Sequence, residues 1–311
     1  MMLSIVATLY RSETHLVEFH ERTSRAASRL AGDEYEIVLV NDGSPDGSLE
    51  MAVRIAAEDP HVVVVDLSRN FGHHKAMMTG LAHAVGDLIF LIDSDLEEEP
   101  EWLEDFAARL AAEKCDVIFG VQEQRKGGWF ERWSGQYFYR YFRLLSGVDL
   151  PDNLVTARLM TRRYVEALLR HGEREIVIAG LWAITGFDQR KHVVKKLSHS
   201  QTTYSIWRKI SIFVNAITSF SSMPLSFMFY IGVFIFITSL IVAINFAAHW
   251  LFASRTISGW TSLIVSIWIL GGIVISFIGV VGMYVGKIFS EVKARPYTIV
   301  RHVYRYENDK N

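Results

Sequence analysis

Two long stretches without a charged side chain constrain the fold of this chain more than any other feature. Residues 210–254 and 256–286 contain no Lys, Arg, Asp or Glu, and Arg255 separates them. A helix rises about 1.5 Å per residue, so the apolar segments at about 225–251 and 263–285 can each cross a hydrocarbon core of about 30 Å. Two buried helices of this kind in a soluble protein would need a far larger domain around them. We therefore expect two transmembrane helices within residues 224–286.

The basic residues that flank these stretches predict an orientation. Arg208 and Lys209 precede the first span, and basic side chains also follow the second, at Lys287, Lys293, Arg295, Arg301 and Arg305. Because Lys and Arg concentrate in cytoplasmic flanks, both termini should lie in the cytoplasm. We expect residues 204–223 to form a juxtamembrane amphipathic segment and residues 287–311 a basic cytosolic tail.

Residues 1–203 have the pattern of an α/β domain. Apolar runs rich in β-branched residues alternate with segments of helical periodicity, and this alternation predicts βαβ units with a mainly parallel sheet. The predicted strands are Leu3–Leu9, Glu36–Val40, His61–Leu67, Asp87–Ile92 and Asp116–Val121. The predicted helices are Leu16–Leu30, Leu49–Ala57, Lys75–Val85 and Pro100–Ala112. In such a sheet, ligands bind beyond the carboxyl ends of the strands.

The sequence also argues against several classes of protein. It contains neither G-x-G-x-x-G nor G-x-x-x-x-G-K-[ST], the motifs of Rossmann dehydrogenases and of P-loop kinases. With a formal net charge of -2, nothing indicates a nucleic-acid partner. Cys115 is the single cysteine, so neither an intrachain disulfide nor a Cys-based metal cluster can form.

Two aspartates directly after a predicted strand carry the chemistry that we expect. Asp93 and Asp95 flank Ser94 at the end of the fourth predicted strand. Two such carboxylates can hold Mg²⁺ or Mn²⁺ together with the phosphates of a ligand, and the cation would stabilise a diphosphate leaving group. The alternative is a pair of solvated turn aspartates. Residues 97–99 are all glutamates, expected to form a solvated first helical turn, and only Glu97 is close enough in sequence to be a third ligand.

Six motifs in register resemble those of family 2 glycosyltransferases of the polyprenol-phosphate group, which includes dolichol-phosphate mannose synthases and bacterial undecaprenyl-phosphate glucosyltransferases. VNDGSPDGS at 40–48 is similar to V-D-D-G-S-x-D-x-T, and LIDSDLEEEPEWL at 91–103 is similar to M-D-A-D-L-Q-x-P-P-E. LSRNFGHHKAMMTGLAHAVGD at 67–87 is similar to L-S-R-N-F-G-x-x-x-A-x-x-x-G-x-x-x-A-x-G-D. The remaining matches are SIVATLYRSE at 4–13, FSSMPL at 220–225 and EVKARPYTIV at 291–300.

The resemblance covers nearly the whole chain and implies an activity. A GT-A-like catalytic domain of Rossmann type would transfer a sugar from a nucleotide diphosphate sugar to a polyprenyl phosphate, with inversion. The protein would modify cell-envelope glycans from the inner membrane of a bacterium, as a homotetramer. We expect a UDP-sugar first, with a GDP-mannose-dependent mannosyltransferase as the alternative. A processive polysaccharide synthase usually carries a Q-x-x-R-W-type motif, which does not follow Arg158. The intact Asp93 and Asp95 argue against a non-catalytic membrane scaffold.

The resemblance also implies roles for individual residues. It assigns the metal and the diphosphate to Asp93 and Asp95, with Glu97 where the family has a metal-binding Gln. It assigns binding of the base and ribose to Thr8, Tyr10, Glu13, Asn41 and Asp42. We further expect Arg69 and Lys75 near the phosphates and Ser94 at the nucleotide. A packed aromatic for Tyr10 and a turn-forming pair for Asn41 and Asp42 are the alternatives. His73 and His74 are expected in a loop or at a helix start near the nucleotide and not as a metal pair.

Residues 124–147 interleave arginines with aromatic residues, a composition typical of an amphipathic segment in the membrane interface. A core-facing helix with a basic outer face is the alternative. In the family, arginines of this region meet the lipid phosphate. The resemblance therefore implies Arg125 and Arg140 as ligands of the acceptor phosphate, with Arg158 and Lys196 as the next candidates.

Three departures from the family pattern leave the identity of the sugar open. Thr156 stands where N-x-G-D-F-R has an acid proposed as a base, residues 200–204 replace G-x-S-K-Y, and Asn41 replaces the first Asp of V-D-D-G-S. The missing acid does not argue against activity. A phosphate monoester has a second pKa near 6 and is largely a dianion at pH 7, so it can attack an anomeric carbon without a base.

Overall fold

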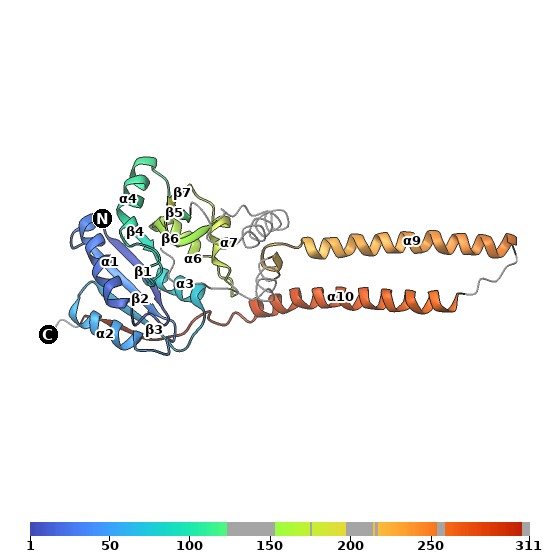
Figure 1. Ribbon diagram of the computed structural model, residues 1–311, viewed down its shortest axis with the longest axis horizontal. Coiled ribbons are helices and arrows are strands. Elements are labelled where there is room, and N and C mark those ends of the chain that lie inside the picture. The colour runs from blue at the N-terminus through green and yellow to red at the C-terminus, as the bar shows by residue number, and fades with distance from the viewer. Residues whose placement is uncertain (123–152, 175, 197–213, 215–216, 254–258, 307–311) are drawn as a thin grey trace. The chain divides into compact units, whose positions relative to one another are not determined.

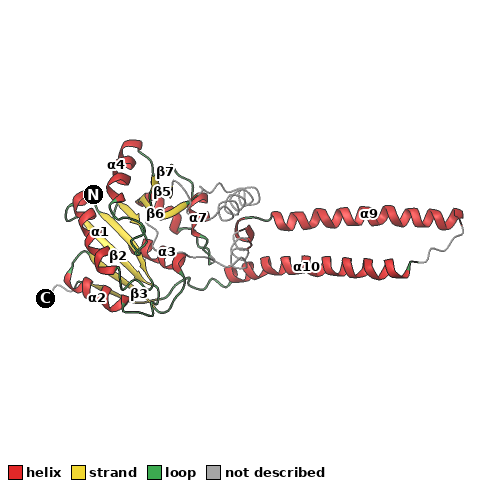
Figure 2. Cartoon of the chain, in the orientation of Figure 1, coloured by secondary structure: helices red, strands yellow, loops and turns green. Residues whose placement is uncertain are grey.

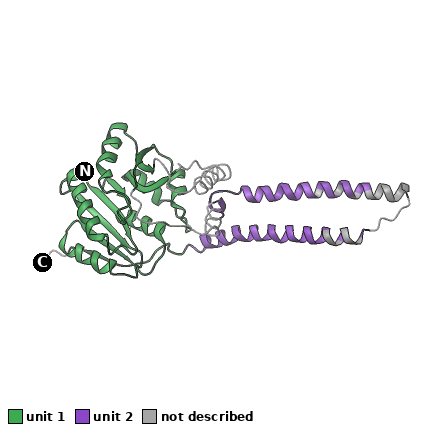
Figure 3. Ribbon diagram, in the orientation of Figure 1, with its two compact units in different colours: residues 1–139, 148–205, 295–311 green, residues 140–147, 206–294 purple. Residues whose placement is uncertain are grey.

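The structure is a computed structural model that describes residues 1–122, 153–174, 176–196, 214, 217–253 and 259–306. The chain divides into two compact units (Figure 3). Unit 1 comprises Met1–Tyr139, Val148–Ser205 and Arg295–Asn311, and unit 2 comprises Arg140–Gly147 and Ile206–Ala294. The segment 124–147 lies outside the described residues, as does most of the predicted juxtamembrane segment 204–223.

Unit 1 is built on an eight-stranded mixed sheet with the strand order β7-β5-β6-β4-β1-β2-β3-β8 (Figures 1 and 2). Neighbouring β4, β1, β2 and β3 run parallel, as do β5 and β7, whereas β6 is antiparallel to β4 and β5, and β8 is antiparallel to β3. The strands are β1 (Leu3–Leu9), β2 (Tyr35–Asn41), β3 (Val62–Leu67), β4 (Leu88–Leu91), β5 (Val117–Gln122), β6 (Leu154–Thr161), β7 (Gln189–Val194) and β8 (Val300–Arg305). The predicted α/β fold is confirmed, with a mixed sheet that is mostly parallel.

Helices cover both faces of this sheet. Ile5 and Ile37 share a buried core with Phe19, on the face covered by α1 (Leu16–Ala31), α2 (Ser48–Glu58) and α4 (Trp102–Glu113). Side chains alternate along a strand, so Val6 and Val40 point the other way. That face carries α3 (His73–His83) and α6 (Arg162–Leu169). A Cβ atom at Gly80 would lie 2.5 Å from a methyl group of Val6, so the glycine lets α3 approach the sheet closely.

The sequence pattern does not predict β8, which lies within the segment expected to be a basic tail. Its backbone pairs with β3, and the N–H of Ser68 donates to the carbonyl of Ile299 at 2.9 Å. Arg301 donates from its guanidinium to the carbonyl of Ser68 at 2.7 Å and lies 3.4 Å from the buried carboxylate of Asp66. The chain therefore returns to unit 1 after its last helix and forms a strand at the edge of the sheet.

Unit 2 contains two long helices that contact each other, α9 (Met223–Ala253) and α10 (Trp260–Val292). In the part of the chain that the structure describes, one segment is long and apolar enough to cross a membrane. It is Ser266–Val292 of α10, with a mean hydropathy of 2.2. The apolar segment found in α9, Met223–Ser239, is shorter. One candidate membrane helix is thus present, and the hairpin of two spans stays a prediction.

Candidate active site

The loops after three neighbouring parallel strands bring polar side chains to one edge of the sheet. Thr8 is near the end of β1, Asn41 ends β2, and Asp93 follows β4. Because β1 lies between β2 and β4, these carboxyl ends are adjacent. This is the edge at which ligands of such sheets bind.

The turn after β2 is fixed to the loop before α3. The carboxylate of Asp42 accepts the N–H groups of Phe71 at 2.7 Å and of Gly72 at 3.0 Å. Burial raises the pKa of this carboxyl group in spite of the two hydrogen bonds, which lower it. Gly43 has a φ of 59°, and a Cβ atom there would lie 2.4 Å from the backbone nitrogen of Asn70. Only glycine allows this left-handed turn to pack so closely.

Both the nitrogen and the oxygen of the Asn41 side-chain amide form hydrogen bonds within unit 1. Its Nδ2 donates to Oδ1 of Asp66 at 2.8 Å, and its Oδ1 accepts the N–H of Ser44 at 3.2 Å. Asn41 and Asp42 therefore shape the loop that would receive a nucleotide. Direct contact between either residue and a base or ribose stays a prediction.

Glu13 precedes α1 in the chain, and its side chain contacts the start of α2. Its Oε2 accepts the N–H of Gly47 at 3.0 Å, and its own N–H donates to Asp46 at 3.3 Å. Asp46 also accepts the hydroxyl group of Ser48 at 2.6 Å. These contacts give Glu13 a role in holding the helix start next to the predicted nucleotide loop.

The other residues predicted to bind the nucleotide are more open. The side chain of Tyr10 is 49 % exposed, so it is not the packed aromatic of the alternative interpretation. Arg69 is exposed and stacks its guanidinium on the ring of Phe71 at 4.1 Å. Lys75 is half-buried in the first turn of α3. Arg69 and Asp42 both contact Phe71 in the loop before α3. Lys75 lies after this loop, in the first turn of α3.

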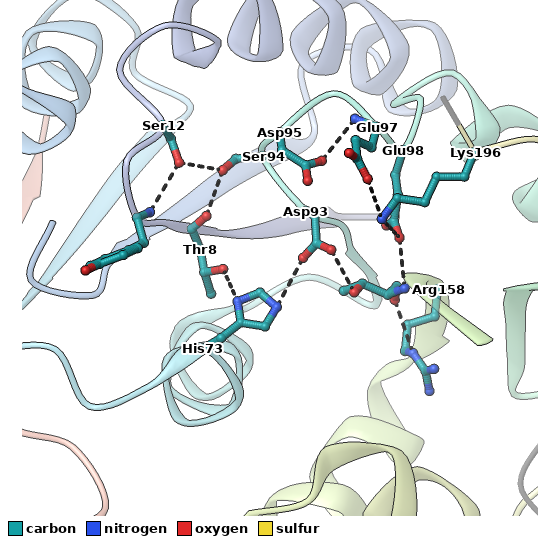
Figure 4. A network of polar contacts seen from close by, with 12 residues as sticks. Thr8, Ser12, His73, Asp93, Ser94, Asp95, Glu97, Glu98, Arg158 and Lys196 are labelled. Carbon is teal, nitrogen blue, oxygen red and sulfur yellow. Dashed lines mark hydrogen bonds and ion pairs between the residues drawn. The ribbon is translucent and has the colours of Figure 1, made fainter. Parts of the chain in front are cut away.

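Asp93 is held from two sides (Figure 4). Its Oδ2 accepts the hydroxyl group of Thr156 at 2.9 Å, and its Oδ1 lies 3.3 Å from Nε2 of His73. The other ring nitrogen of His73 is 2.9 Å from the hydroxyl oxygen of Thr8. Burial by itself would raise the pKa of Asp93, but His73 and Thr156 hold it below its usual value. His73 begins α3, so of the two expected positions, a loop or a helix start, it takes the second.

The two residues after Asp93 point in different directions. Ser94 is buried and donates its hydroxyl group to the carbonyl of Thr8 at 2.8 Å. Asp95 is exposed, and its Oδ1 accepts the N–H of Glu97 at 3.0 Å. Partial loss of hydration raises the pKa of Asp95, and the charge of Asp93 adds to this shift. The segment thus presents one firmly oriented carboxylate and one accessible carboxylate.

Asp93 and Asp95 fit a divalent cation that is shared with phosphates. Apart from its ion pair with His73, Oδ1 of Asp93 is buried without a hydrogen-bond partner among the described residues. No group of three His, Cys, Asp or Glu side chains in that part of the chain is arranged to hold a metal. Mg²⁺ needs only one or two carboxylates when substrate phosphates and waters complete its shell. Glu97 lies 3.2 Å from Lys196 in an ion pair, so its place in a metal shell stays a prediction.

Glu98 is a site residue that the sequence analysis missed. Instead of forming a solvated helical turn, residues 97–99 precede α4, which begins at Trp102, and Glu98 is 1 % exposed. Its Oε1 accepts the N–H of Thr156 at 2.9 Å and lies 3.7 Å from Lys196. Burial, followed by the charge of Asp93, raises the pKa of Glu98 to about 8.

Arg158 is buried beneath this cluster. Its guanidinium lies on the ring of Trp182, 3.0 Å from the ring centre, and its Nε donates to the carbonyl of Thr156 at 3.4 Å. Burial lowers the pKa of Arg158 to about 9. Contact between Arg158 and an acceptor phosphate stays a prediction, and Arg125 and Arg140 lie outside the described residues.

Comparisons with known proteins show the family of this chain. The family model described as glycosyl transferase family 2 matches residues 4–169, which is over half of the chain. The chain is 51% identical to a Mycobacterium tuberculosis glycosyltransferase, over 98% of this chain and 89% of that protein. It is 33% identical to the Bacillus subtilis glycosyltransferase YkcC, over 99% and 95% of the two chains. It is also 31% identical to the SfII prophage-derived bactoprenol glucosyl transferase of Shigella flexneri, over 98% and 99%. The chain belongs to glycosyltransferase family 2.

Proposed function

We propose that this glycosyltransferase transfers a sugar from a nucleotide diphosphate sugar to a polyprenyl phosphate. The observation that carries the proposal is the polar network at the edge of the sheet, in which His73 joins Thr8 to Asp93 and leaves Asp95 accessible. The acceptor is inferred from the similarity to the bactoprenol glucosyl transferase, which extends over 98% of this chain. A UDP-sugar is the proposed donor.

The arrangement suits displacement of a nucleotide diphosphate. Mg²⁺ or Mn²⁺, when bound, supplies positive charge to the diphosphate leaving group. Asp93 and Asp95 would hold that ion, and the contacts of Asp93 with His73 and Thr156 fix its carboxylate in advance. An oxygen of the acceptor phosphate then forms a bond to the anomeric carbon while the bond from that carbon to the nucleotide diphosphate breaks. Attack from the opposite side inverts the configuration.

No side chain has to remove a proton in this reaction. The acceptor phosphate is largely a dianion at pH 7. Thr156, which stands where the family motif carries an acid, donates its hydroxyl group to Asp93. In this chain the residue at that position therefore orients a carboxylate.

The sheet supports a membrane hairpin. β7 precedes the two long helices in the chain and β8 follows them, yet both strands belong to one sheet. If unit 1 lies on one side of a membrane, the chain must cross that membrane an even number of times between these strands. If Ser266–Val292 crosses once, α9 can supply the second crossing. We propose a bacterial inner-membrane protein with both termini in the cytoplasm, and a homotetramer stays a prediction.

A lipid-labelling assay tests the proposed function. Membranes that contain the protein are incubated with undecaprenyl phosphate and radiolabelled UDP-, GDP- or CDP-sugars, and the lipid is extracted. We expect label from a UDP-sugar in the organic phase, and a labelling rate lower by about a hundredfold or more with the Asp95→Asn variant. Label from GDP-mannose alone would favour the mannosyltransferase. Absence of labelled lipid with every donor would contradict the proposal.

A further inference from the structure

A cavity of about 270 Å³ lies beside the Asp93 network. A water molecule occupies about 30 Å³ of liquid, and pockets for drug-sized ligands start near 300 Å³. The cavity is therefore suited in size to one sugar ring and not to a whole nucleotide sugar. Thr156, which holds Asp93, is part of its wall. The other lining residues are His73, His74, Met77, Glu98, Gln122, Leu154, Val155, Ile178, Ala179, Trp182 and Lys196.

Two lining residues carry buried polar atoms without a partner among the described residues. One is Oε2 of Glu98, whose other oxygen already accepts the N–H of Thr156. The other is Nε1 of Trp182, a residue that is 5 % exposed and stacked on Arg158. Buried polar groups are nearly always hydrogen-bonded, so these two atoms, both in residues of the cavity wall, call for a partner.

We propose that this cavity binds the sugar ring of the donor, with Glu98 and Trp182 as hydrogen-bond partners of its hydroxyl groups. A sugar hydroxyl group can accept from Trp182, and it can pair with Glu98 in either protonation state because it is both a donor and an acceptor. Met77, Leu154 and Ile178 provide an apolar wall for the C–H groups of the ring. This inference rests on the proposed function, and it makes Glu98 a residue that selects the sugar.

Lys196 and Arg158 keep the two partners in place. The ammonium group of Lys196 lies 3.2 Å from Glu97 and 3.7 Å from Glu98, so it holds the carboxylate of Glu98 at the wall. The guanidinium carbon of Arg158 lies over the ring of Trp182, 3.0 Å from its centre. A ligand would therefore meet side chains whose positions are already fixed, which lowers the entropic cost of binding.

Calorimetry on the detergent-solubilised protein with Mn²⁺ tests the assignment. The probes are UDP, UDP-glucose and the UDP-deoxyglucose analogues that lack one hydroxyl group each. In Glu98→Ala, we expect UDP-glucose to bind about tenfold more weakly, because the hydrogen bond between a sugar hydroxyl group and the side-chain carboxyl group is lost. UDP should bind as in the wild type, and the preference of the wild type for UDP-glucose over one particular analogue should disappear.

Three further variants sharpen this test. Glu98→Gln keeps a side-chain oxygen and should retain part of the preference. Trp182→Phe keeps a ring over Arg158 but removes the N–H donor, so it should lose selectivity for a hydroxyl group by several-fold. Glu99→Ala is the matched control, because the half-buried Glu99 does not line the cavity and should leave every affinity unchanged.

Each outcome bears on the assignment. Equal losses for UDP and UDP-glucose in Glu98→Ala would show a structural role and overturn it. Unchanged affinities would show that water alone fills the cavity, with the same consequence. If the lipid assay identifies another nucleotide sugar, that sugar, its nucleoside diphosphate and its deoxy analogues are the probes. A wild-type protein that binds no nucleotide would overturn the proposed function itself, whatever the Glu98 variants do.

Discussion

At the scale of single residues, Asp93 and Asp95 differ in how the domain holds them. Asp93 is fixed by Thr156 and His73, whereas Asp95 is exposed and accepts only a backbone N–H among the contacts described. We therefore expect Asp95→Asn to keep the fold and to lower the transfer rate by roughly 10²–10⁴, the effect of a lost metal ligand. EDTA should abolish transfer. Mn²⁺ binding, followed by paramagnetic resonance in the presence of UDP, should weaken in parallel, and full activity of the variant in chelator would refute the prediction.

Asp46 gives a prediction about pH. Partial burial alone would raise the pKa of Asp46, but hydrogen bonds from Ser44, Ser48 and the N–H of Glu13 lower it to about 2, against an ordinary value of 3.8. A depressed pKa means that the carboxylate stabilises the folded state above about pH 4 and that this contribution disappears as the pH falls towards 2.

The matching experiment is thermal unfolding of Asp46→Ala across this pH range. At pH 7 the variant should lose about 0.5–2 kcal/mol, as helix-start residues do, which lowers the Tm by roughly 2–4 °C per kcal/mol in a domain of this size. The difference from the wild type should shrink below pH 4. Asp46→Asn, which keeps an acceptor oxygen, should be less destabilised at pH 7. A difference that stays constant down to pH 2 would contradict the assignment.

Some residues of the candidate site can be predicted from the sequence, and others cannot. Asp93 and Asp95 are recognisable because their motif follows a continuous apolar strand directly. Glu98 looks like one more member of an acidic run, and its burial depends on Thr156 and Lys196, which are distant in the chain. A periodicity of hydrophobic residues carries no information about such a contact. Asn41 was recognised as polar at a strand end, but its bond to Asp66 needs the register of β2 against β3.

At the scale of secondary structure, burial on both faces makes β1 and β2 recognisable from the sequence, whereas β6, although it lies between β5 and β4, is not among the predicted strands. β1 and β2 are buried along their whole length, so their apolar runs predict them to within a residue or two. β7 and β8 lie at the two edges of the sheet and carry charged, half-exposed side chains. An edge strand needs fewer apolar residues, and its sequence resembles a polar loop.

β8 gives a prediction at this scale. Asp66 is fully buried, its Oδ1 accepts from Asn41, and its Oδ2 has the guanidinium of Arg301 at 3.4 Å. Arg301→Met keeps the length of the side chain but leaves the carboxylate without its cation, so we expect a loss of about 1–3 kcal/mol in the free energy of unfolding. Chemical denaturation measures it. Arg305→Met is the matched control on the exposed end of the same strand, and equal losses in both variants would point to strand propensity instead of the ion pair.

At the scale of the whole molecule, the sheet of unit 1 joins both ends of the segment that contains α9 and α10. The strand after α10 pairs with β3, whose neighbour β2 ends at the predicted nucleotide loop. Helices α9 and α10 are therefore inserted in the chain between two strands of one sheet. A truncation that removes residues 299–311 would leave the backbone groups of β3 unpaired at the edge, which favours aggregation.

The same connectivity makes the topology testable. With Cys115 replaced by serine, single cysteines are placed at Glu50 in α2, at Arg305 in β8 and at Ser258 in the connection between α9 and α10. Because α2 and β8 belong to one unit, Glu50→Cys and Arg305→Cys must behave alike. An impermeant maleimide should label Ser258→Cys in spheroplasts and the other two only after permeabilisation, since the basic flanks favour the cytoplasm. Labelling of the two domain positions alone would reverse the orientation, whereas different accessibility of Glu50→Cys and Arg305→Cys would require an odd number of crossings and so would contradict the sheet itself.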